Sequence, residues 1–173
     1  MKKTLRFLLA FLIAFILMLV VRTAGITLYT VSDAVLEPVF AAGDRVLVNR
    51  WSYGLKVGGK GSFFGYGRIV RQSVEKGDLI AFENPKDTRQ VLIGRIAALP
   101  GDSVSHDGQM FIVPGLNDCA DADYYWLEAV DSHVLGMIAE EYIIGRVSMI
   151  AYSRDPQQPI WKGWRHSRLF LPL

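Results

Sequence analysis

The chain begins with one long apolar stretch and continues with short alternating ones. Residues 7–21 are apolar without interruption and follow three basic residues. At 1.5 Å per residue a helix over this run spans roughly 22 Å, less than the ~30 Å core of a bilayer, whereas continuing it to Tyr29 gives about 34 Å. The pattern predicts a cytoplasmic tip and one membrane anchor helix over residues 1–29.

A cleaved secretory signal also has a basic start and an apolar middle. The residues after the run, Arg22–Gly25, make a poor cleavage site because Arg22 stands where a small residue is required. Both interpretations keep the N-terminus in the cytoplasm and translocate the rest of the chain. The sequence leaves open whether the anchor is retained.

The remaining residues, 30–173, predict β-structure. Runs of four to ten apolar and β-branched residues are bounded by Gly, Pro, Asp or Asn, as strands are. The predicted strands are 45–48, 77–82, 90–93, 95–99, 109–113 and 143–152. Six glycines within residues 54–67 favour a loop there. With no second long helical period, the expected fold is a mostly antiparallel β domain tied to one N-terminal transmembrane helix.

Charge and cysteine content exclude several functions. The net charge of +2 becomes −2 once the four Lys and Arg residues of positions 1–22 are set aside. This removes the basic surface that nucleic-acid binding requires. The lone Cys119 excludes an internal disulfide, and the three histidines are isolated, so no metal or other cofactor is expected.

A glycine-rich motif, Gly54-x-x-x-x-Gly59-Lys60, is similar to a phosphate-binding loop. Gly61 stands where Ser or Thr would coordinate magnesium, and the following residues do not begin a helix. The sequence therefore predicts no nucleotide binding.

Four blocks of sequence resemble the bacterial type I signal peptidase family. They are residues 32–54, 76–85, 93–104 and 131–146. The most specific of them is Gly94-Arg95-Ile96-Ala97-Ala98-Leu99-Pro100-Gly101-Asp102. The resemblance implies a signal-peptidase/LexA-like antiparallel β fold. The short stretch at about 114–123 implies that the accessory region of larger members is truncated.

The resemblance also implies a Ser-Lys dyad, in which serine attacks a peptide carbonyl and a buried lysine accepts the proton. Counting from Pro38 puts the serine position at Val35, and the lysine position, just before Arg95, is Gly94. Neither residue has the required group, and losing such a unit costs on the order of 10⁶ in turnover. The sequence predicts that ordinary peptidase activity is lost. In the family, the residues matching Arg95 and Asp131 support each other, so this pair is expected to persist as a scaffold contact.

The leading hypothesis is an inactive, membrane-anchored homologue that binds extended polypeptide. The family holds substrate between two strands through backbone groups, a mode that needs few side chains. The predicted peptide-binding residues are Asp33, Ala34, Val35, Leu36, Val91, Leu92, Ile93 and Gly94. The expected partners are the membrane, an exported or pilus-type polypeptide, and an active signal peptidase that the protein modulates. The expected location is the cytoplasmic membrane, crossed once, with the N-terminus inside and the β domain on the outer (periplasmic or extracellular) face.

Two alternatives remain open. One is an active membrane-bound serine endopeptidase with an atypical dyad that uses Ser32 with Lys56 or Lys60. Ser32 is an odd number of residues from Val35, which places it on the opposite face of an extended strand, and a flexible loop lysine lacks the fixed geometry of a base. The other is a structural envelope protein whose cleft is closed.

Overall fold

A computed structural model describes residues 2–31, 39–59, 65–106, 108–118, 120–128, 136–159 and 162–173. The helix α1 (Lys2–Ala24) precedes the strands β1 (Ile26–Thr30), β2 (Asp44–Asn49), β3 (Leu55–Val57), β4 (Gly67–Ile69), β5 (Leu79–Glu83), β6 (Val91–Ala98), β7 (Ser103–His106), β8 (Gln109–Ile112), β9 (Tyr124–Glu128), β10 (Met137–Ala139), β11 (Ile143–Ser153) and β12 (Leu171–Pro172). Short 3₁₀ turns cover Leu116–Asp118, Glu140–Tyr142 and His166–Arg168. The mostly β prediction is confirmed.

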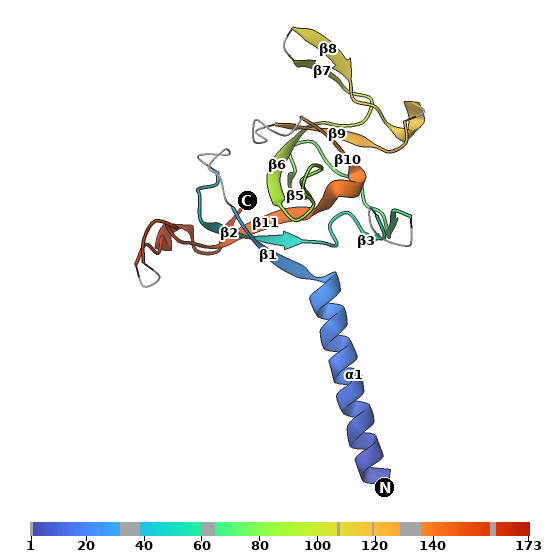
Figure 1. The fold of residues 1–173 in the computed structure, drawn as a ribbon, viewed down its shortest axis with the longest axis vertical. Coiled ribbons are helices and arrows are strands. Elements are labelled where there is room, and N and C mark those ends of the chain that lie inside the picture. Colours follow the sequence, from blue (N-terminus) through green and yellow to red (C-terminus); the bar gives the residue numbers. More distant parts are fainter. Residues whose placement is uncertain are drawn as a thin grey trace.

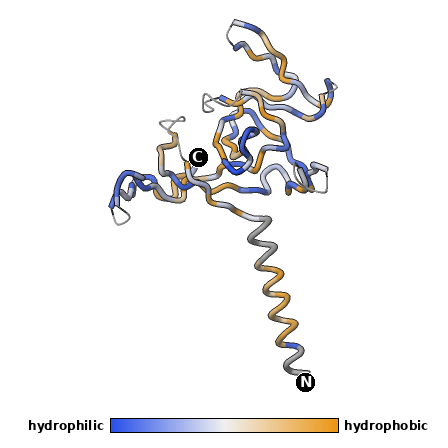
Figure 2. The backbone as a smooth tube through the Cα atoms, viewed as in Figure 1, coloured by the Kyte–Doolittle hydropathy of each residue, from blue (hydrophilic) through white to orange (hydrophobic). Residues whose placement is uncertain are grey.

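Helix α1 projects from the β domain as a single rod (Figure 1). The large apolar side chains from Phe7 to Met18 are each at least 49% exposed, and apolar residues follow one another along the rod (Figure 2). The helix ends at Ala24, so the prediction that it continues to Tyr29 is wrong. After Gly25 the chain instead forms β1, whose residues alternate in exposure as a strand's do. Within the described side chains, no helix is both long and apolar enough to cross a membrane.

Eight of the strands form one curled antiparallel sheet in the order β1-β2-β11-β5-β6-β9-β10, with β12 also paired to β11. The two predicted strands at 90–93 and 95–99 form the single strand β6. The ribbon of β7 and β8 projects from the side opposite α1 (Figure 1). The prediction of a loop over residues 54–67 is wrong at both ends of that range, because β3 and β4 pair there as a second ribbon.

Alternation along the strands divides the buried residues between two clusters. In β6, Leu92 and Ile96 pack in one cluster with Phe82 and Tyr142. Val91 and Ile93 pack against the other, whose buried members are Val31, Phe40, Val46, Val48, Ala81, Ile144, Val147 and Ile150. We call this second set the Phe40 cluster. Both faces of the sheet are therefore used for packing, which fixes the register of β5 and β6.

The C-terminal segment is tied to the residues that follow the predicted nucleophile block. The Asp44 carboxylate is fully buried and accepts hydrogen bonds from Arg168 Nη2 at 2.7 Å and from the Ala41 N–H at 2.9 Å. Arg168 also donates to the Val39 carbonyl at 2.6 Å. Gly43 has a φ of +89°, and a Cβ there would lie 2.0 Å from a backbone oxygen of Arg154, so only glycine fits this turn.

Candidate functional site

The position that the sequence aligns with the family's lysine, Gly94, lies in β6 opposite Ile80 of β5 and is buried. Near it, the Ile96 N–H donates to the Asp78 carbonyl at 2.9 Å, and the Ile96 carbonyl accepts a hydrogen bond from the Gly77 N–H at 2.8 Å. Both bonds join Ile96 to the turn that precedes β5. Backbone groups of an antiparallel strand alternate between its two edges. Gly94 therefore faces β5, whereas Val91 and Ile93 direct their N–H and C=O groups to the opposite edge.

The described strands pair with only part of that opposite edge. Strand β9 pairs with the second half of β6, where Arg95 lies opposite Glu128 and Ala98 opposite Trp126. Along residues 91–93, none of the described strands pairs with this edge. We call this stretch the β6 edge. Among the described residues, the backbone groups of Val91 and Ile93 on this edge have no strand partner.

Several predicted site residues lie outside the described residues. They are Ser32, Asp33, Ala34, Val35, Leu36, Lys60 and Asp131. Val31 and Phe40, which flank the first five of these, both belong to the cluster against which Val91 and Ile93 pack. Val31 and Phe40 therefore lie on the face of the sheet that carries the side chains of the β6 edge. The Arg95–Asp131 pair remains a prediction.

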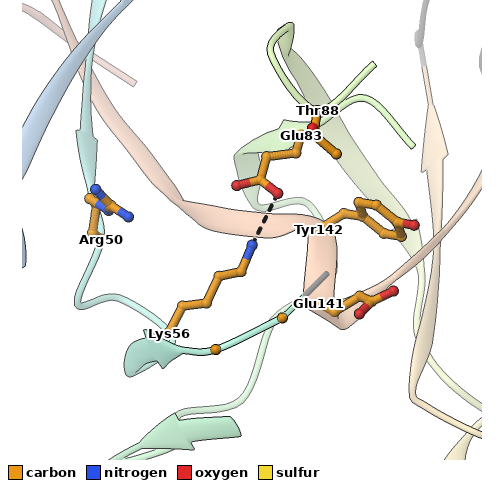
Figure 3. Close-up of a pocket in the computed structure, with 8 residues that line it drawn as sticks. Arg50, Lys56, Glu83, Thr88, Glu141 and Tyr142 are labelled. Atoms are coloured by element: carbon orange, nitrogen blue, oxygen red, sulfur yellow. Dashed lines mark hydrogen bonds and ion pairs between the residues drawn. The ribbon is translucent and has the colours of Figure 1, made fainter. Parts of the chain in front are cut away.

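A pocket of about 240 Å³ lies where the sheet meets the β3 segment (Figure 3). The Lys56 ammonium is 3.1 Å from a Glu83 carboxylate oxygen, and Arg50, Thr88, Glu141 and Tyr142 also line the pocket. Glu83 lies opposite Val91, so the pocket is at the end of the β6 edge.

Lys56 does not take the place of the family's lysine. It is paired with Glu83, and Val91 opposite Glu83 is three residues from Gly94, or about 10 Å along a strand. A general base must lie within hydrogen-bond reach of the proton that it removes. The alternative dyad that uses Lys56 is therefore not supported by this geometry.

The same pocket adjoins the start of the β domain. The Arg50 N–H donates to the carbonyl of Gly25, just after α1, at 3.4 Å. Burial raises the pKa of the Tyr29 hydroxyl; nearby Arg50 lowers it and Glu83 raises it, and the net direction is upward. Tyr29 therefore stays a neutral phenol at physiological pH.

A second pocket, of about 570 Å³, lies between residues 71–74, Leu99 and Tyr125. Arg71 lines it and binds both Asp123 and the buried Glu140, whose second partner is Arg68 at 3.3 Å. These carboxylates are engaged in ion pairs that hold the segment after β4 to the sheet. Across the described residues, no three His, Cys, Asp or Glu side chains are placed to hold a metal ion.

The sequence did not predict the pocket at the β6 edge. Lys56 and Glu83 are 27 positions apart, and the glycine-rich segment between them was expected to be a loop. The available signal was that Glu83 directly follows the predicted strand at 77–82. That signal places a carboxylate at a strand end but does not identify its partner.

Comparison with known proteins gives a consistent picture. Residues 4–121 match the family model described as "Signal peptidase, peptidase S26". Signal peptidase I of Pseudomonas fluorescens is 28% identical over 104 residues, covering 56% of this chain and 33% of the relative. Signal peptidase I of Rickettsia bellii (strain OSU 85-389) is 29% identical over 100 residues, covering 55% and 34%. Signal peptidase IB of Staphylococcus aureus (strain Mu50 / ATCC 700699) is 27% identical over 114 residues, covering 66% and 50%. The chain thus matches between a third and a half of the length of these relatives.

Proposed function

Because the chain belongs to the S26 signal peptidase family, we propose that it is a membrane-anchored member that binds extended polypeptide of exported proteins without cleaving it. The β6 edge beside Gly94 carries this proposal. Its clients would be exported or pilus-type polypeptides, and it would act as an accessory of secretion or as a modulator of an active signal peptidase.

Cleavage would need two side chains that the sequence lacks. Val35 has no hydroxyl to attack a carbonyl, and Gly94 has no amine to accept the proton. Lys56, which lines the pocket at the end of the β6 edge, is paired with Glu83. Removing one member of a nucleophile and base unit costs nearly as much as removing all of it.

Binding, by contrast, needs the backbone of the β6 edge. Val91 and Ile93 together offer two N–H donors and two C=O acceptors to an added strand. At about 0.5–1.5 kcal/mol net for each hydrogen bond, four bonds contribute about 2–6 kcal/mol. The cost of ordering the peptide offsets much of this, so affinity from the edge alone is in the millimolar range or weaker. Such weak binding suits a transient contact with a passing chain.

The membrane anchor is part of the same proposal. Helix α1 has 23 residues and a length of about 34 Å, comparable with the ~30 Å thickness of a bilayer core. The exposed apolar side chains from Phe7 to Met18 would be covered by lipid rather than water. The basic residues before them favour a cytoplasmic N-terminus, and with it a β domain on the outer face.

The test is photo-crosslinking in membranes during export of a precursor. A photoreactive amino acid at position 91, 93 or 94 of the full chain is expected to form adducts with the precursor. The same amino acid at Gln109, which is exposed on the ribbon of β7 and β8, serves as the control and is expected to form few. Absence of adducts at all three positions, or equal yields at position 109, would overturn peptide binding. Release of mature product by the purified protein would overturn inactivity.

A further inference from the structure

Four charged side chains line the pocket of Figure 3: Arg50 after β2, Lys56 in β3, Glu83 at the end of β5 and Glu141 before β11. The Lys56 ammonium and the Glu83 carboxylate neutralise each other at 3.1 Å. Arg50 acts electrostatically on Tyr29, a neutral phenol at physiological pH. The carboxylate of Glu141 is turned away from the ion pair in Figure 3 and has a partner of its own. Arg50 is therefore the charged group lining the pocket that has no ion-pair partner among the described residues.

This positive charge lies on the face of the sheet that carries the side chains of the β6 edge. Val91 packs against the Phe40 cluster, and Glu83 is its cross-strand neighbour on the same face. Arg50 lies in the turn directly after β2 and lines the same pocket as Glu83. If a bound polypeptide pairs with Val91, its next residues lie at the mouth of the pocket.

We infer that this pocket binds an acidic side chain of the bound polypeptide, next to the residue that pairs with Val91, so that Arg50 determines specificity. The inference rests on the proposed peptide binding. A guanidinium matches a carboxylate with two parallel hydrogen bonds, which gives both strength and a defined geometry. A volume of about 240 Å³ accommodates one Asp or Glu side chain.

A lipid phosphate shares this chemistry, and Arg50 lies close to the end of α1 through its bond to Gly25. The pocket favours a peptide carboxylate because it lies at the end of the β6 edge, where a side chain of a paired peptide can reach it.

The test uses the full chain in neutral detergent and fluorescent ten-residue extended peptides. Each peptide carries one Glu or, as its matched isostere, one Gln at a given position, and binding is measured by anisotropy at low salt. We expect a Glu peptide of one register to bind about tenfold more tightly than its Gln isostere, as one charge-assisted hydrogen-bond pair provides. The preference should disappear in Arg50→Gln and persist in Arg89→Gln, an exposed arginine of the β5–β6 turn that does not line the pocket.

A second variant separates recognition from a structural role. Glu83→Gln releases Lys56 from its partner, so affinity for the Glu peptide should rise, which a merely damaged fold would not produce. Equal binding of Glu and Gln peptides, or an unchanged preference in Arg50→Gln, would overturn the inference while leaving peptide binding intact. No binding of any peptide, together with no adducts in the crosslinking test, would overturn the proposed function itself. If Arg50→Gln weakens binding to phosphatidylglycerol vesicles and leaves the peptide preference unchanged, the pocket is a lipid headgroup site and the inference is wrong.

Discussion

Replacing Arg168 by alanine would leave the carboxylate of Asp44 buried without its cationic partner. Asp44 is fully buried, and the Arg168 side chain is 20% exposed. Removing one member of a buried ion pair costs about 3–5 kcal/mol, and partial access of water to Arg168 favours the lower end of that range. A loss of about 3 kcal/mol lowers the melting temperature of a domain of this size by about 6–12 °C.

The loss should depend on pH in a defined direction. Burial alone would raise the pKa of Asp44, but hydrogen bonds from Arg168, the Ala41 N–H and Ser153 hold it below its ordinary value. A carboxyl whose folded pKa is lowered stabilises the fold above its unfolded pKa of about 3.9, and this stabilisation is lost as the pH falls through the folded pKa. Without Arg168 the effect of burial prevails and the folded pKa of Asp44 rises. The variant is therefore destabilised at neutral pH, and this destabilisation decreases when acid protonates Asp44. The difference between the two proteins should therefore shrink below about pH 5.

The assay is urea unfolding of the full chain in non-ionic detergent, followed by tryptophan fluorescence at pH 7 and pH 4. The control is Arg165→Ala, which loses bonds to two neutral acceptors, the Ala42 carbonyl at 3.2 Å and Ser153 Oγ at 3.4 Å. The control should lose about 1 kcal/mol at both pH values. Equal stability of the two variants at pH 7, or a difference for Arg168→Ala that does not change with pH, would refute the reasoning.

Two further changes test the fold and the site. A Cβ at Gly145 would lie 2.3 Å from the Asn49 carbonyl oxygen, so Gly145→Ala should cost at least about 2 kcal/mol, whereas Gly65→Ala, with open space around it, should change the urea midpoint little. Val35→Ser combined with Gly94→Lys should restore cleavage of an exported precursor on gels, and neither change alone should do so, because the two groups act as a unit. Activity of either single variant would reveal another nucleophile or base, and an inactive but folded double variant would show that the frame no longer fits the reaction.

The sequence predicted the strands that alternate strongly and have clear boundaries. Residues 45–48, 77–82 and 143–152 became β2, β5 and β11, whose inward residues are fully or nearly buried. Strand β1 was missed because Ile26–Thr30 continues an apolar run, and only the structure shows its outward residues exposed. Periodicity alone cannot separate a short apolar strand from the end of an apolar helix.

The site was predictable only in part, for a similar reason. Gly94 could be located by counting within the block that ends in Pro100-Gly101-Asp102. The β6 edge beside it depends on the register in which β9 pairs with β6, and the pocket depends on a ribbon that brings Lys56 back to Glu83. Both are long-range consequences of register, which local patterns do not encode.

Binding and cleavage depend on different atoms in this fold. A lysine at the buried position of Gly94 would carry a desolvation cost of several kcal/mol, and without a hydroxyl at Val35 it would have nothing to activate. Glycine at that position removes the cost and leaves the backbone bonds to β5 in place. The β6 edge uses main-chain groups of Val91 and Ile93, which no side-chain replacement at position 94 removes. The two catalytic side chains can therefore be absent while the surface that would hold a polypeptide remains.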